Sequence, residues 1–141
     1  MLTEENKITR LSNAVAAGTT DVESTSIDMD GFDEATFIAD LGAIVSGAVT
    51  SAKLQGSSDN SSFSDLEGTG LTIGDTDDNE LVVLNIVRPQ HRYLKMVIDR
   101  GTQNATVDSI LCIQSQAREV PVTQPTGVNV ERHVSPAAGT A

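Results

Sequence analysis

The residues best placed to do chemistry stand in the stretch IGDTDDNELVVL, at positions 73–84. Its polar side chains occupy alternate positions, as the first oxygen ligands of a calcium loop do: Asp75, Asp77 and Asn79. A helix–loop–helix calcium site also needs glycine at the sixth loop position and a bidentate glutamate at the twelfth. Counted from Asp75, these positions hold Glu80 and Ile86, so this motif is excluded.

A shallower cation site stays open, formed by three carboxylates of the same turn: Asp75, Asp77 and Asp78. The competing interpretation is an acidic turn between strands, because Asp and Asn stabilise turns by hydrogen bonding to their own backbone. We favour the turn, and we expect no metal and no cofactor. The loop SSDNSSF at 57–63 is likewise interpreted as a solvated hairpin tip, with a hydrogen-bonding contact loop as the alternative.

Nucleophiles and bases are scarce. The two histidines, His91 and His133, have no ligand spacing with the single cysteine, Cys112. Cys112 lies in the apolar run SILCIQ and is expected to be a small buried hydrophobe. Motifs such as GxSxG, GxxxxGK[ST] and GxGxxG are absent from the sequence, although a spatial triad leaves no such trace. We therefore expect no enzymatic activity.

Charge and hydropathy restrict the partners. The 141 residues carry a formal net charge of −11, which repels phosphate backbones, so nucleic acid is not an expected partner. With three Phe, one Tyr and no Trp, an aromatic sugar platform is disfavoured. No 18-residue apolar run or secretory leader is seen, so we expect a soluble product of the host cytoplasm that does not enter a membrane.

Short apolar bursts separated by turn residues predict an all-β protein, an antiparallel β-sandwich or jelly-roll-like fold with extended N- and C-terminal arms. Strands are expected at 24–29, 35–41, 48–56, 71–73, 81–88, 93–99 and 105–116. The run LVVLNIV is apolar on both faces and predicts a central strand that is covered on both sides. Turns at Pro89 and at residues 101–104 predict a continuous antiparallel meander over 81–116.

Three segments are expected: an N-terminal arm (1–20), a β-sandwich domain (21–118) and an extended C-terminal tail (119–141). Within the first, residues 8–17 fit either a helix or an edge strand, because so short a segment does not separate the two periods. The tail is rich in proline and poor in apolar residues, so order there requires another surface.

Basic residues cluster around the turn at Pro89 in an otherwise acidic chain: Arg88, Arg92, Lys95 and Arg100. They could form a patch for an acidic partner. The alternative, which we favour slightly, is ordinary cross-strand pairing with Asp or Glu.

Several phrases resemble small virion proteins of tailed bacteriophages that are encoded near the major capsid gene. They are TSIDMDGFDEATFI, SAKLQGSSDNSSFSDLEGT, DTDDNELVVL, HRYLKMVIDRGTQNA and REVPVTQ, and the resemblance spans most of residues 10–125. The resemblance implies a capsid cement or head-decoration role on the virion exterior, without catalytic residues. It implies the major capsid protein as partner and a homo-oligomer, either a trimer or a dimer.

Under this hypothesis, residues of the two ends and of the basic turn contact the capsid: Ile8, Arg10, Leu11, Arg88, Arg92, Arg118, Val120 and Val122. Two rival functions stay open. A host-recognition module of a fibre would bind surface glycan through loops 57–65 and 74–80. A head-completion or tail-tube protein would assemble into a ring.

Overall fold

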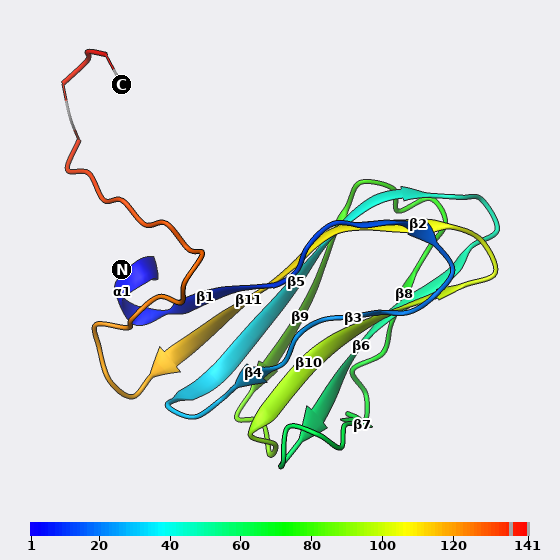
Figure 1. Cartoon of the computed structure of the whole chain (residues 1–141), viewed down its shortest axis with the longest axis horizontal. Helices are drawn as coiled ribbons and strands as arrows, with labels where there is room; N and C mark the ends of the chain where they lie inside the picture. The colour runs from blue at the N-terminus through cyan, green and yellow to red at the C-terminus, as the bar shows by residue number, and fades with distance from the viewer. Residues whose placement is uncertain (136, 141) are drawn as a thin grey trace.

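The computed structural model describes residues 1–135 and 137–140, and they form two antiparallel sheets packed face to face (Figure 1). The first, sheet A, contains β1 (Lys7–Ser12), β2 (Val15–Gly18), β5 (Phe32–Ile44), β9 (Leu81–Val87) and β11 (Ala105–Ala117). The second, sheet B, contains β3 (Val22–Glu23), β4 (Ile27–Asp28), β6 (Val49–Ser57), β7 (Ser64–Asp65), β8 (Leu71–Ile73) and β10 (Tyr93–Gly101). A short helix, α1 (Leu2–Glu5), precedes them. The predicted all-β antiparallel sandwich is confirmed.

Alternation along the long strands places the core between the sheets. In β5, Phe37, Ala39 and Leu41 are buried, whereas Ile38 between them faces outward and is half-buried. In β11, Ile110 and Cys112 point inward in the same way, so the prediction of a buried cysteine is confirmed. Sheet B contributes further buried side chains: Ala52, Leu54, Leu94, Met96 and Ile98.

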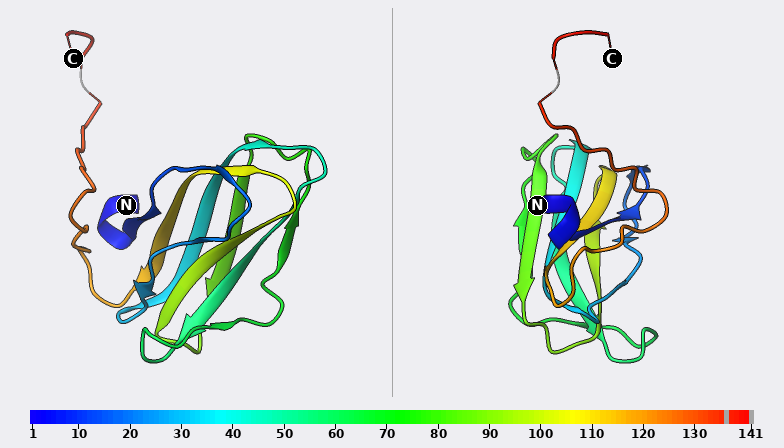
Figure 2. Two further views of the ribbon diagram at one scale, coloured as in Figure 1. Left: turned by 45° about the vertical axis from the view of Figure 1, so that its right-hand side comes forward. Right: turned by 90° about the vertical axis from the view of Figure 1, so that its left-hand side faces the viewer.

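The strand order is β1-β11-β5-β9 in sheet A and β3-β10-β6-β7 in sheet B. Strand β2 also pairs with β11, β4 with β10, and β8 with β6. The views in Figure 2 show the two layers and the short strands at their margins. Within the described part of the chain, no helix is both long and apolar enough to cross a bilayer.

The predicted meander over 81–116 is wrong. Strand β9 pairs with β5 in sheet A, β10 pairs with β6 in sheet B, and β11 returns to sheet A. Both turns are present, but each carries the chain from one sheet to the other. Turn residues indicate that the chain reverses direction, and they do not indicate which layer the returning strand joins.

The prediction of a central strand at LVVLNIV is also wrong, because β9 lies at an edge of sheet A. Val82 is buried and faces the core, while Leu81 and Val87 are 63% and 52% exposed on the outer face. Apolar residues on both faces therefore mark an exposed apolar surface here. The sequence pattern cannot separate that case from burial on both sides.

The expected N-terminal arm is part of the sandwich. Strand β1 pairs with β11 in the register Ile8↔Ile113, so the edge-strand interpretation of residues 8–17 is the one the structure shows. The inward side chain Leu11 is 3% exposed and belongs to the core. Its backbone oxygen accepts a hydrogen bond from the N–H of Thr25 at 3.0 Å, which ties the edge to sheet B.

The buried side chain of Arg100 attaches the second strand of the N-terminal segment, β2, to the rest of the sandwich. The side chain of Arg100 is 3% exposed and donates hydrogen bonds to backbone oxygens of Thr20 at 2.6 Å, Ala16 at 2.9 Å and Ala105 at 2.7 Å. The planar guanidinium group carries several N–H donors, so it can bond to several carbonyl oxygens at once. Arg100 therefore fastens β2 and the following loop to the body.

Candidate functional site

Three turns meet at one end of the sandwich, and they bring the predicted arginines together. Arg88 and Arg92 come from the connection between β9 and β10, and Arg118 follows β11. They line an open hollow of about 350 Å³ together with Met29, Asp30, Phe32, Asp33, Pro89, Gln90 and His91. We call this group of residues the end surface.

Two of these arginines are already paired with acids. The Nε and Nη2 atoms of Arg92 lie 2.9 and 2.8 Å from the two carboxylate oxygens of Asp28, a bidentate pair that lowers the pKa of Asp28. Arg118 Nη2 lies 2.8 Å from Asp33 Oδ1. Because these pairs are exposed to solvent, they add little to the stability of the fold and serve mainly to fix the loops.

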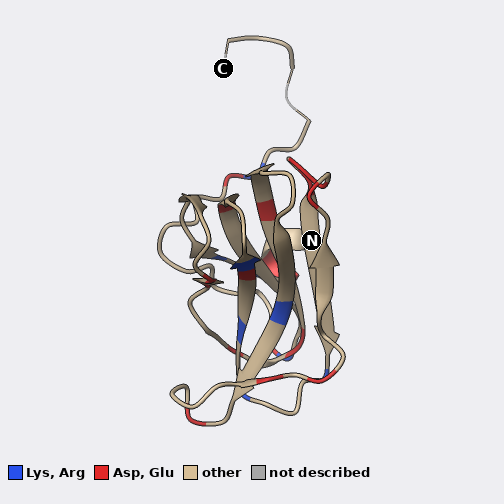
Figure 3. Ribbon diagram, turned by 90° about the vertical axis from the view of Figure 1, so that its right-hand side faces the viewer, with Lys and Arg blue, Asp and Glu red and all other residues tan. Residues whose placement is uncertain are grey.

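Pairing with Asp or Glu is therefore present for two of the four basic residues, Arg92 and Lys95. Lys95 Nζ lies 2.6 Å from a carboxylate oxygen of Glu23 on the neighbouring strand, and Arg100 binds backbone oxygens. Figure 3 shows the few basic residues scattered among acidic ones. Arg88 differs: it is exposed, has a positive φ of 51°, and forms no salt bridge with the described residues.

The two ends of the chain pack against each other beside this surface. The Gln124 side chain accepts a hydrogen bond from the N–H of Ile8 and donates to the backbone oxygens of Thr3 and Asn6. The N–H of Val122 donates to the oxygen of Glu4 at 2.8 Å. The first part of the expected free tail is therefore attached to the N-terminal segment.

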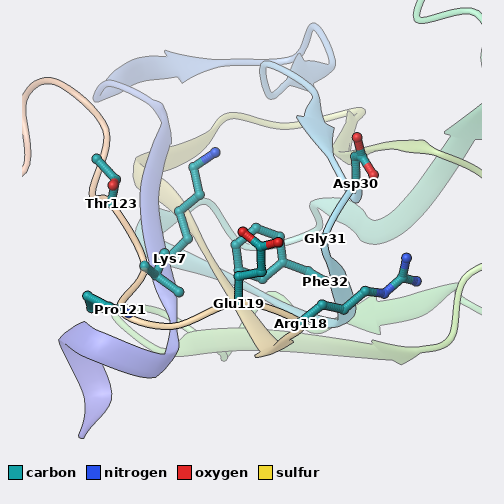
Figure 4. A pocket seen from close by; sticks show the side chains of 9 residues that line it. Lys7, Asp30, Gly31, Phe32, Arg118, Glu119, Pro121 and Thr123 are labelled. Atoms are coloured by element: carbon teal, nitrogen blue, oxygen red, sulfur yellow. The ribbon is translucent and has the colours of Figure 1, made fainter.

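A second open hollow, of about 460 Å³, lies between this attached segment and the end surface (Figure 4). Its lining includes charged side chains of both signs and a few apolar ones: Lys7, Asp30, Gly31, Phe32, Arg118, Glu119, Pro121, Val122 and Thr123. In Figure 4, Lys7 and Arg118 extend in different directions, so the two cations do not converge on one point. Such a surface suits a polypeptide contact.

The other predicted contact residues are dispersed. Ile8 and Arg10 lie on the outer face of sheet A, where they border a small hollow with Leu111 and Val128. Val120 is exposed and Val122 is half-buried in the attached segment. Leu11 is buried in the core, so it does not contact a partner in this conformation.

The three carboxylates considered as metal ligands each accept a hydrogen bond from a backbone N–H group. Asp77 accepts a hydrogen bond from the N–H of Gly74 at 2.7 Å, Asp75 accepts one from Gly47 at 2.7 Å, and Asp78 accepts one from Ile44. The carboxylates thus fix their own turn and the loop between β5 and β6. Across residues 1–135 and 137–140, no group of three His, Cys, Asp or Glu side chains could hold a metal ion.

The remaining reactive groups lie apart. Burial raises the pKa of the Cys112 thiol to about 12. The His91 ring packs on the backbone of Gly56, and His133 lies 3.2 Å from Glu131 in the tail. In loop 57–63, the Asp59 carboxylate accepts hydrogen bonds from the N–H groups of Ser61 and Ser62.

No protein family matches the chain. No curated protein matches it either. Among solved structures, the crystal structure of PBSX exported protein XepA has a similar fold, with a TM-score of 0.55 and 14% sequence identity. The match covers 91% of this chain and 43% of that protein, so the chain spans less than half of its length. At this identity the similarity shows a shared fold.

Proposed function

We propose that this chain is a non-enzymatic structural protein of a phage virion, which decorates the capsid and stabilises it by bridging major capsid subunits. Two independent observations support the link to phages. The phrases quoted from residues 10–125 resemble small virion proteins of tailed bacteriophages. The fold is similar to that of PBSX exported protein XepA.

The observation that carries the proposal is the form of the C-terminal segment. The described residues from 129 to 140 are all exposed, and the segment leaves the body as an extended chain (Figure 1). It contacts α1 through Arg132, whose Nη1 lies 2.6 Å from Glu4 Oε1. An extended, weakly packed segment gains order when a neighbouring protein provides a surface or a sheet edge.

The beginning of this arm is fixed in space. Gln124 holds it against Ile8, so residues 129–140 start from a defined point beside the end surface. Because the arm starts from a fixed point, its effective concentration at a neighbouring subunit is raised. On a repeated capsid lattice, several weak contacts of this kind add up to a higher overall affinity. Because β1 and β2 are strands of sheet A, we assign this role to the C-terminal arm alone.

Truncation after Val128 tests the proposal, because it keeps Gln124, and every removed residue that the structure describes is exposed. We expect an unchanged midpoint of thermal unfolding and a loss of affinity for mature phage heads of about tenfold or more. Val134→Asp is the matched point variant in the arm, and Val49→Asp is its control on the body, since both valines are exposed. Unchanged binding of the truncated chain to heads would overturn the arm mechanism.

A further inference from the structure

Strand β9 is an edge without the protection that the other edges have. It contains seven residues, LVVLNIV, with no proline and no charge. The edge strands of sheet B are only two or three residues long, and the opposite edge of sheet A has a bulge between Arg10 and Ser12. Proteins shorten, bulge or charge their edges because open edges pair with other strands. An unprotected edge therefore indicates a partner strand.

The free hydrogen-bonding groups of β9 can be assigned. The N–H of Arg88 donates to Asp33, and the N–H of Leu41 donates to Glu80, so the even-numbered positions of β9 bond to β5. Bonded positions alternate along an antiparallel pair. The backbone groups that face the open edge are therefore those of Leu81, Val83, Asn85 and Val87.

The sequence of β9 is complementary to itself in one antiparallel register. When Leu84 faces Leu84 of a second copy, Val83 faces Asn85 and Leu81 faces Val87. The residues with free backbone groups then meet each other, and the Leu84 pair falls at a position without hydrogen bonds. On the outer face, the exposed side chains of Leu81 and Val87 cover each other, and this pair occurs twice.

Charge selects the same register. Immediately outside the strand, Glu80 faces Arg88 of the second copy, and symmetry repeats the pair at the other end. Both side chains are exposed, and neither forms a salt bridge with any residue that the structure describes. Moving the register by two residues would place Glu80 opposite Ile86 or Gln90, so this charge pairing would be lost.

We infer that β9 is the binding surface for a second copy of this chain. The two strands pair antiparallel about a two-fold axis at Leu84, and the two A sheets become one continuous sheet. The contact is isologous, so it closes at a dimer and leaves the C-terminal arm of each copy free. This inference does not depend on the proposed function.

Charge exchange in the full-length chain tests the register. Sedimentation equilibrium is expected to give a dimer, and Glu80→Lys or Arg88→Glu alone raises its dissociation constant about tenfold, because each places like charges at both ends. The double variant Glu80→Lys with Arg88→Glu restores the original constant. The midpoint of thermal unfolding of the monomer is expected to be the same in all variants, since these side chains are exposed. Single variants that dimerise like the original chain, or a double variant weaker than both, overturn the inference.

A cross-link tests the two-fold axis. Cα atoms of a facing pair without hydrogen bonds are about 4.5 Å apart, within the range of a disulfide. Leu84→Cys is therefore expected to form a covalent dimer on oxidation. The control is Leu81→Cys, which is more exposed but faces Val87 of the second copy. A chain that stays monomeric, forms a larger ring, or cross-links equally through both positions overturns the inference.

Discussion

The side-chain oxygen of Gln124 accepts a hydrogen bond from the backbone N–H of Ile8, with 2.9 Å between nitrogen and oxygen. The amide nitrogen of the same side chain lies 3.0 Å from the oxygen of Thr3 and 2.6 Å from that of Asn6. One side chain thus satisfies backbone groups on α1, β1 and the residue between them. It also fixes the point from which the C-terminal segment leaves the body.

Replacing Gln124 with alanine is expected to lower the free energy of unfolding by about 1–3 kcal/mol, because partly buried backbone groups lose their partner. Urea unfolding measures the loss, and hydrogen exchange of the Ile8 amide reports its location. The control is Gln103→Ala, at an exposed turn position, with an expected change within about 0.5 kcal/mol. An Ile8 amide that stays equally protected in the Gln124 variant would contradict the assignment.

A close contact between Gly56 and His91 gives the second prediction. A Cβ atom at Gly56 would lie 2.7 Å from Cγ and 3.0 Å from Cβ of His91, too near for either to remain in place. Gly56→Ala is therefore expected to cost about 1–3 kcal/mol of stability. Adding His91→Ala should recover most of the loss in a double-mutant cycle. Gly70→Ala is the control, since nothing lies within 4 Å there, and additive losses would disprove the contact.

The loop around Asp59 gives a pH prediction. Hydrogen bonds from Ser62, Ser57 and Ser61 lower the pKa of the Asp59 carboxyl from 3.8 to about 2. A lowered pKa in the folded chain means that ionised Asp59 stabilises the loop above pH 3.8, and that this contribution is lost as the pH falls through 2. NMR titration should show the Ser61 and Ser62 amide signals moving in that range. Asp59→Asn should abolish the shift, and a midpoint near 3.8 would contradict the hydrogen-bonded loop.

The positions of most strands could be predicted from the alternation of apolar and polar residues, because a strand with one buried face needs apolar side chains at every second position. The segment 35–41 indeed lies inside β5, and 105–116 lies inside β11. The layer that each strand joins could not be predicted, since Pro89 marks a reversal whether or not the chain changes sheets. The edge position of β9 was missed for a related reason: exposed apolar residues and buried ones have the same sequence pattern.

At the candidate site, the meeting of Arg88, Arg92 and Arg118 could not be derived from sequence, although each had been singled out. Their proximity follows from the packing of three turns. Gln124 was not singled out from the sequence, and Arg100 was named only as a member of the basic cluster. Their structural roles were missed because a polar side chain that bonds distant carbonyl oxygens leaves no spacing to recognise. The acidic turn was interpreted correctly for Asp77, which bonds the N–H of Gly74 within the turn. The bonds of Asp75 to Gly47 and of Asp78 to Ile44 join residues distant in sequence, and local reasoning did not predict them.

The passage of the chain from β9 in sheet A to β10 in sheet B and back to β11 has a consequence for folding. Among the described strands, only β6 and β7 are both consecutive in sequence and paired with each other, and that pairing is short. Lys7 must find Gln114, close to the other end of the sequence, before β1 is in place. High contact order of this kind slows folding, because loop closure precedes any gain from pairing. The sandwich should therefore fold and unfold as one cooperative unit, over milliseconds to seconds, with no stable half.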